Sequence, residues 1–509
     1  MRLLTIRIEN FRSYRNQVEV PVGNLTTIVG KNDIGKSSIL EALDIFFNKG
    51  KGLVKMDKDD VNKSCLRKGN RITEISLTFD QFPKAIIIDS TIETSLGAEH
   101  LLNKSGHLEI IKRYGNGGSE RVFIKANHPT NKSCSDLLLK TQRELQDIIK
   151  TKKIECENKT RNAVMRTSIW SHYSDNLDLE EVEIDVTKGE TKSIWDKLEN
   201  YLPLYSLFQS DRKNSDTDNE VQDPLFEAVK QIINSGEVQE TLANVAEIVE
   251  GKLREVAKLT LDKLREMNPE IADSLNPVIP SSDSLKWNDI FKKVSVTGDE
   301  DIPINKRGSG VKRLILLNFF RAEAERRRTE RSVPSVIYAI EEPETSQHTA
   351  HQKMLIKALL ELSKADSTQI LLTTHSPVIV KEMDFDHLRL ILLENENKVV
   401  NRVLSGQLPY PSLNEVNFTA FEEITEEYHN ELYGFLESEG LINDFKNGKE
   451  TMDYIRLKKD GSTHAERKVL TEYIRHQIHH PENTHNPRFT ESQLRESIGL
   501  MRSYINEQN

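Results

Sequence analysis

The chain has 509 residues, of which 37% are hydrophobic and 29% are charged, and its formal net charge is −10. This length allows about two to four domains. The acidic balance excludes a surface that is basic throughout, so contact with DNA would come from local patches or from a partner. No apolar run of about eighteen residues and no signal-peptide pattern occurs, which predicts a cytoplasmic protein that does not bind a membrane.

A phosphate-loop pattern lies near the N-terminus. Residues 30–37 spell G-x-x-x-x-G-K-[ST] between an apolar β-branched run, 25–29, and apolar residues at helical spacing. Glycines let backbone N–H groups point at the β-phosphate, Lys36 brings a positive charge to the β- and γ-phosphates, and the Ser37 hydroxyl binds Mg²⁺. We therefore predict that the chain binds ATP with Mg²⁺. The nucleotide-binding residues predicted here are Gly30, Asn32, Gly35, Lys36, Ser37 and Ser38.

The long segment that follows carries no readable chemistry. Apolar residues at spacings of three and four in 137–153 and 225–275 predict long amphipathic helices, and 202–212 predicts a strand that returns to the core. The polar segment 214–223 predicts a mobile loop. Such an arm can dimerise or hold DNA. Dimerisation is the favoured interpretation because apolar stripes require burial and no basic face is evident.

Small residues open a helical pattern at 306–313, KRGSGVKR. Bare N–H groups at the start of a helix, together with the Ser309 hydroxyl, can bind an anion. A simple helix cap is the alternative, and the motif alone does not decide between them.

A second nucleotide element follows at 336–344. Residues 336–340 form a continuous apolar run typical of a buried parallel strand, and the run ends in EEPE. This is a Walker B pattern with Glu in place of the usual Asp. Glu341 is predicted to support Mg²⁺, and Glu342 to orient and polarise the water that attacks the γ-phosphate. A chance acidic turn is the alternative.

A third apolar run, 369–372, leads into TTHSP. A histidine at the end of a core strand beside the γ-phosphate can hydrogen-bond that phosphate and report its presence. We predict this role for His375, against the alternative of a structural histidine.

The order of these motifs resembles that of ABC-type ATPases related to chromosome-maintenance and RecF proteins, and within them the overcoming-lysogenization-defect (OLD) group. The stretch IRIENFRSY at 6–14, followed by VGKNDIGKSSILEAL, supports the resemblance, which covers roughly 1–130 and 285–385. It implies that Ser309 of one subunit contacts the γ-phosphate of ATP held by Lys36 of another, in a head-to-tail homodimer. It also implies that Arg12 lies near the nucleotide. Gln81, after a predicted strand, is a candidate for the family's glutamine loop.

Relatives that cut DNA carry a TOPRIM nuclease domain after the histidine motif, with a Glu after one strand and D-x-D after another. Here Asp384 and Asp386 precede the predicted strand 388–393, so we predict no nuclease of the chain's own. The sequence is most similar to the ATPases of Septu anti-phage systems. That similarity implies an HNH nuclease partner that acts in trans.

The C-terminal part is predicted to be helical and polar, with aromatic anchors. Arg475 and His480 match the R-x-x-x-x-H pattern of HEPN ribonucleases, in which both side chains would handle a phosphodiester. The alternative is a helix end that Pro481 stops, with histidines favourable at the C-terminal dipole.

The predicted fold class is α/β: an ABC-type ATPase head split by a long helical insertion, with an α-helical C-terminal domain. The predicted domains are 1–130, 131–284, 285–400 and 401–509. The predicted function is an ATP-binding regulatory ATPase that forms dimers or multiples of dimers and controls a nuclease partner. The alternatives are a RecF-like DNA-repair ATPase that binds DNA, and an ATPase with a C-terminal ribonuclease.

Overall fold

The computed structural model describes residues 1–48, 52–87, 93–115, 118–187, 191–209, 236–273, 275–278, 295–298, 335–345, 348–395, 397–403, 412–458 and 460–508. The chain divides into two compact units: Met1–Thr26 with Ser37–Thr373, and Thr27–Lys36 with Thr374–Asn509. The phosphate loop is thereby grouped with the C-terminal part of the chain. The predicted loop 214–223 and the segment 306–313, with Ser309, lie outside the described residues.

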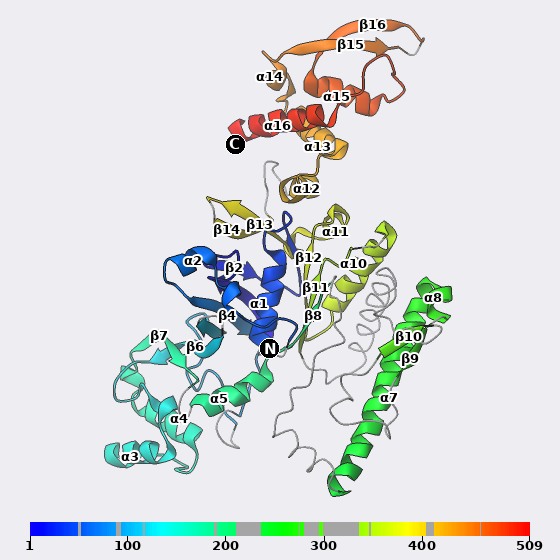
Figure 1. The fold of residues 1–509 in the computed structure, drawn as a ribbon. Helices are drawn as coiled ribbons and strands as arrows, with labels where there is room; N and C mark the ends of the chain where they lie inside the picture. The colour runs from blue at the N-terminus through cyan, green and yellow to red at the C-terminus, as the bar shows by residue number, and fades with distance from the viewer. Residues whose placement is uncertain are drawn as a thin grey trace. The chain divides into compact units, whose positions relative to one another are not determined.

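An antiparallel sheet dominates the N-terminal part of the first unit (Figure 1). Its strand order is β2-β1-β4-β5-β6-β7. Apolar residues alternate with charged ones along these strands, so one face packs into the core and the other carries cross-strand ion pairs. The strands are β1 (Arg2–Glu9), β2 (Val18–Pro21), β4 (Ile72–Asp80), β5 (Leu108–Gly115), β6 (Ser119–Pro129) and β7 (Leu179–Asp185).

Three parallel strands form the second layer of this unit. β11 (Val336–Glu341) pairs in parallel with β8 (Leu204–Phe208) on one side and with β12 (Thr368–Thr374) on the other. All residues of β12 are buried, as the continuous apolar run predicted. Because the strands are parallel, their carboxyl ends meet at one edge. Ile340 lies opposite Phe208, and Glu341 opposite Thr373.

Helix α1 (Lys36–Asn48) follows the phosphate loop, and its apolar stripe is buried. Its last turn receives a buried cation: the Lys112 Nζ donates to the Phe46 carbonyl oxygen at 2.9 Å. A positive charge at the C-terminal end of a helix is favourable, because the last carbonyls there have no partner within the helix.

The described part of the predicted insertion is mainly helical. It also contains β8, inside the range predicted for a returning strand, and the strands β7 and β9 (Leu275–Val278), which the prediction did not include. The alternation of apolar and acidic residues in β7 fits an edge strand. The helices of this region are shorter than predicted around 137–153, and include α3 (Gln142–Lys152), α4 (Asn162–His172), α5 (Thr191–Leu198), α7 (Gly236–Met267) and α8 (Pro269–Asp273), beside the short strands β9 and β10 (Ser295–Gly298).

In the second unit, β13 (Leu388–Glu394) pairs in parallel with residues 27–29 of β3 (Leu25–Val29) and antiparallel with β14 (Asn397–Arg402). The D-x-D residues Asp384 and Asp386 precede β13, as predicted. None of the helices in the described part of the chain is long and apolar enough to cross a membrane.

The C-terminal helices enclose a core of their own, centred on Tyr428, Leu432, Ile498 and Met501. A hairpin of β15 (Thr451–Leu457) and β16 (Thr463–Val469) adds to the predicted helices, and α15 contacts both its strands and α16 (Figure 1). Sequence analysis missed the hairpin because most of its residues are polar and exposed. The helices are α11 (Pro377–Lys381), α12 (Leu413–Phe421), α13 (Glu426–Ser438), α14 (Ile442–Lys446), α15 (Leu470–His479) and α16 (Glu491–Gln508).

Candidate nucleotide-binding site

The phosphate loop joins β3 to α1 through two glycines at positive φ. Gly30 has φ of +155° and Gly35 has φ of +103°, a region that disfavours residues with a side chain. A Cβ at Gly30 would also lie 2.9 Å from the carbonyl oxygen of Ile391. Both glycines of the pattern are therefore required by the backbone, and the resulting loop can turn N–H groups toward an anion.

Lys36 is the first residue of α1, and only 4% of it is exposed. Its Nζ donates to the carbonyl oxygens of Gly30 at 2.9 Å and Lys31 at 3.0 Å. The ammonium thus lies over the loop, at the positive end of a helix. This arrangement suits a phosphate group, because charge and bare N–H groups act on the same anion.

The other predicted loop residues differ in exposure. Ser37 is half-buried in the first turn of α1, Ser38 is buried, and Asn32 is exposed. A hydroxyl at Ser37 is accessible to a ligand, whereas Ser38 is largely enclosed by the protein.

The acidic pair Glu341 and Glu342 stands at the end of β11, and both residues are half-buried. Glu342 has φ of +40°, which is unusual for a residue with a side chain. Its N–H donates to the Thr373 carbonyl oxygen at 3.0 Å and to the Thr373 Oγ1 at 3.3 Å. The neighbouring strand thus fixes the turn that presents the two carboxylates.

Tyr205 of β8 links the acidic strand with α1. Its hydroxyl donates to the Leu40 carbonyl oxygen at 2.6 Å, within α1. Burial raises the pKa of Tyr205 well above its usual range, and the nearby carboxylates of Asp44 and Glu341 raise it further. Tyr205 thus joins β8, the neighbour of β11, to the middle of α1.

Arg12 lies against α1 and its partners fix it on several sides. Its guanidinium pairs with Glu41 of α1 and, at 2.8 Å, with Asp60. Its backbone N–H donates to the Asp60 carbonyl oxygen, and the Asn62 side chain donates to the Arg12 carbonyl oxygen at 2.6 Å. The resemblance placed Arg12 near the nucleotide. The structure places it against the helix that follows the phosphate loop.

Sequence analysis missed Gln209, which follows β8. Its Nε2 donates to Glu41 Oε1 at 3.1 Å, so it joins the same polar cluster as Arg12. Gln209 lies inside the range 202–212 that was predicted as one strand, and the end of β8 at Phe208 places it at the carboxyl edge that also carries Glu341.

The candidate Gln81 was wrong. It lines a small pocket with Ser335, Thr368 and Gln369, where β11 and β12 begin. Glu341 and Glu342 lie at the opposite ends of these strands, because the strands are parallel. The sequence alone did not show at which end of the parallel strands β11 and β12 a glutamine that follows an antiparallel strand would lie.

His375 follows β12 and is exposed. The next residue, Ser376, begins α11: its hydroxyl accepts the Ile379 N–H at 3.4 Å, and Pro377 occupies the first turn. The TTHSP motif is thus a strand end followed directly by a capped helix.

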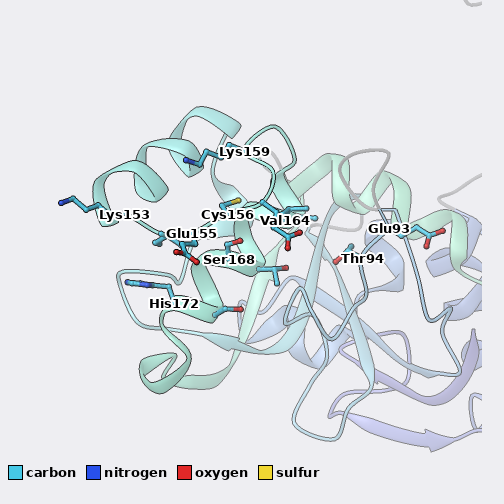
Figure 2. Close-up of a pocket in the computed structure, with 14 residues that line it drawn as sticks. Glu93, Thr94, Lys153, Glu155, Cys156, Lys159, Val164, Ser168 and His172 are labelled. Carbon is cyan, nitrogen blue, oxygen red and sulfur yellow. The ribbon is translucent and has the colours of Figure 1, made fainter.

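A hollow of about 1150 Å³ on the first unit lies elsewhere (Figure 2). Residues 93–94 and 153–172 supply its lining, and none of them is a predicted site residue. Figure 2 shows Lys153 extending away from the other labelled side chains.

The two residues of the ribonuclease pattern contact different partners. The Arg475 guanidinium stacks over the Tyr433 ring at 4.1 Å and pairs with Glu437 at 2.9 Å, both on α13. His480 is exposed and its Nδ1 lies 3.1 Å from Glu482. Arg475 of α15 thus packs against α13.

A phosphate loop before a buried helix, with paired carboxylates ending a parallel strand, defines the chain as a nucleoside triphosphatase of the α/β class. Residues 1–380 match the AAA_15 family, described as the AAA ATPase domain. The chain therefore belongs to this family and carries its ATPase domain.

Three characterised proteins are similar to parts of the chain. Endonuclease GajA of Bacillus cereus is 23% identical over 405 residues, which are 79% of this chain and 59% of GajA. The OLD nuclease of Thermus scotoductus is 33% identical over 102 residues, 20% of this chain and 18% of that protein. The DNA double-strand break repair Rad50 ATPase of Sulfolobus acidocaldarius is 31% identical over 116 residues, 22% of this chain and 12% of Rad50. The chain thus spans less than two thirds of each relative.

Among solved structures, the chain is similar to an SMC head bound to the C-terminal winged-helix domain of ScpA, with a TM-score of 0.42 and 14% identity over 79% of this chain and 97% of that one. The SMC head domain from Thermotoga maritima has a TM-score of 0.35 and 12% identity, over 80% and 100%.

Proposed function

We propose that the chain is the regulatory ATPase of an anti-phage defence complex of the Septu type, and that it binds and controls an HNH nuclease supplied by a second polypeptide. In this proposal ATP binds between two copies of the chain. The single observation that carries it is the grouping of the phosphate loop with residues 374–509 in one compact unit. The loop that binds ATP therefore belongs to the same unit as the C-terminal helices, which have a core of their own. We propose that these helices bind the partner.

The proposed residue roles follow from the site. Lys36 and the loop N–H groups hold the phosphates, Glu342 orients the attacking water, and His375 reads the γ-phosphate. Ser37 and Glu341 would hold Mg²⁺, since hydroxyl and carboxylate oxygens are ligands that this ion prefers. Bound Mg²⁺ supplies positive charge that neutralises the phosphates. Arg12 is proposed to act near the nucleotide, and Ser309 to complete the site from the partner subunit.

The relatives support a link between this chain and nucleases. GajA and the OLD protein carry the name nuclease, and the alignment to GajA covers most of this chain. We propose that the nuclease is supplied in trans because Asp384 and Asp386 precede β13 instead of following a strand, which is where a metal-binding D-x-D would stand.

The test is co-expression of the chain with the nuclease encoded beside it. We expect the two proteins to purify together, and cellular DNA to be damaged during infection only when both are present. Lys36→Ala should abolish protection while leaving the complex intact. Purification of the ATPase alone, with no nuclease-dependent protection, would contradict the proposal.

A second candidate is a DNA-repair ATPase, which the similarity to Rad50 favours. It requires ATP-dependent DNA binding by the chain alone. Filter binding across a salt series separates the two functions, because a DNA-binding chain loses affinity steeply as salt displaces its phosphate contacts.

The ribonuclease alternative requires RNA cleavage by the purified chain that His480→Ala abolishes. RNA that stays intact in the presence of the purified chain and ATP would contradict the ribonuclease alternative. The packing of Arg475 against Tyr433 speaks for a structural role instead.

A further inference from the structure

Two side chains from the C-terminal part of the second unit hold the phosphate loop from outside. Lys398, on β14, donates from its Nζ to the carbonyl oxygen of Ile34. Glu422, which ends α12, forms an ion pair with Lys31. Neither residue belongs to a nucleotide-binding pattern, yet each contacts a residue between the two glycines of the loop.

The Lys398 contact fixes the direction of a loop N–H. The Ile34 carbonyl and the Gly35 N–H belong to one planar trans peptide, so they point in opposite directions. A cation that holds the carbonyl outward therefore turns the Gly35 N–H inward, toward the place where a phosphate binds. Gly35 alone does not ensure this orientation, because glycine at positive φ permits several peptide orientations.

Burial supports a defined position for this lysine. Lys398 is half-buried, and desolvation lowers its pKa to about 8. A lysine is kept in such a place when it has a hydrogen-bond acceptor, because an unpaired buried charge is costly.

The Glu422 contact leads back to the C-terminal core. Glu422 adopts the left-handed conformation with φ of +56°, so the end of α12 is fixed by its backbone. Earlier along α12, the Arg502 guanidinium of α16 lies 4.6 Å from the Phe418 ring and 3.8 Å from Glu415. Arg502 also donates to the Tyr428 hydroxyl at 2.5 Å, in the core of the C-terminal helices.

These contacts form a continuous path from α16 through α12 to Lys31. The path continues into the site, because the Lys31 carbonyl oxygen accepts from Lys36 Nζ. A movement of the C-terminal helices would therefore act on α12 and, through Glu422 and Lys31, on the loop.

We propose that Lys398 and Glu422 are positioning residues of the phosphate loop, and that through α12 they couple the C-terminal helices to nucleotide affinity. This inference rests on the proposed function in one respect: it gives the physical route by which a partner bound to the C-terminal domain senses ATP. By reciprocity of linked binding, such a partner would change ATP affinity by the same factor by which ATP changes the affinity for the partner.

The first experiment compares Mg-ATP binding by calorimetry in the full chain and in Lys398→Met. We expect the Kd to rise about tenfold, the effect of losing a charge-assisted hydrogen bond, and Lys398→Arg to restore most of the affinity. Lys364→Met is the matched control, since Lys364 is exposed and pairs with Glu361 on α10 (Thr349–Ser363). Thermal unfolding should be the same for all variants.

The second experiment exchanges charges. Lys31→Glu and Glu422→Lys should each weaken ATP binding about threefold, and the double variant should recover the affinity if the pair acts directly. Failure of the unchanged chain to bind ATP would overturn the proposed function itself. Normal binding in the unchanged chain, with Lys398→Met and the charge exchanges also normal, would overturn this inference alone.

Discussion

Two sets of charged residues in the first unit differ in burial and in purpose. At the carboxyl edge of the parallel strands, Glu341 and Glu342 are half-buried and end a strand. Glu99, which precedes the insertion, and Arg166 of α4 are both buried and make two hydrogen bonds, at 2.7 and 3.0 Å, and Thr94 donates a third to Glu99 at 3.0 Å.

This difference in burial separates residues that act in catalysis from residues that stabilise the fold. A half-buried carboxylate at a strand end keeps contact with solvent and can be neutralised at little cost to folding. A buried pair leaves its partner desolvated when one member is removed. Substitution of a half-buried carboxylate at the strand end should therefore change catalysis alone. Substitution of one member of the buried pair should change stability alone.

The largest effect should come from Glu342→Gln. Loss of a group that orients and polarises the attacking water should lower kcat for ATP hydrolysis by about 10²–10⁴-fold. The Kd for ATP should change little, because the amide keeps the shape of the side chain. Phosphate release measured beside equilibrium ATP binding checks both. A variant with normal turnover would remove Glu342 from its proposed role.

Glu99→Gln should have nearly as large an effect, on folding instead of on rate. Removing one charge of a buried pair costs about 3–5 kcal/mol, so the midpoint of urea unfolding should fall markedly. The ATP turnover of the protein that remains folded should be normal. The replacement of both residues, Glu99→Met with Arg166→Met, should recover part of the loss, which a role outside the pair would not allow.

A buried histidine in the C-terminal helices extends the comparison to pH. His429 is fully buried, its Nε2 lies 3.0 Å from the Ser497 hydroxyl, and burial lowers its pKa to about 4 from an ordinary value of 6.5. Between these two values the unfolded chain binds a proton that the folded chain does not, so stability falls as pH decreases from 6.5 to 4 and changes no further below 4. The expected loss is about 3 kcal/mol.

Urea unfolding between pH 7 and 4 measures this term. His429→Gln keeps a hydrogen-bonding group for Ser497 and should reduce the pH dependence by about one proton. An equal slope in both proteins would show that other groups account for the acid sensitivity.

The sequence was most informative where local backbone and burial follow from short patterns. Gly30 and Gly35 adopt the positive φ that the loop pattern demands, and the run before Glu341 is the buried parallel strand it indicated. Sequence analysis erred where the answer depends on long-range pairing. The edge of the sheet that Gln81 reaches follows from the strand order, and the contact of Lys398 with Ile34 joins residues 364 positions apart.

The smallest effect should come from an exposed ion pair, which completes the comparison with Arg166. Arg121 of β6 pairs with Asp185 of β7 at 2.5 Å, and 53% of its side chain is exposed. Against the effect of desolvation, hydrogen bonds from Thr187 and from Arg121 hold the pKa of Asp185 below its usual range. Even so, Arg121→Gln should cost at most about 1 kcal/mol, because solvent screens the pair and an ordered arginine loses side-chain entropy. Urea unfolding of this variant beside Glu99→Gln compares two arginine–carboxylate pairs that differ in burial, and equal losses would mean that burial does not set their contributions.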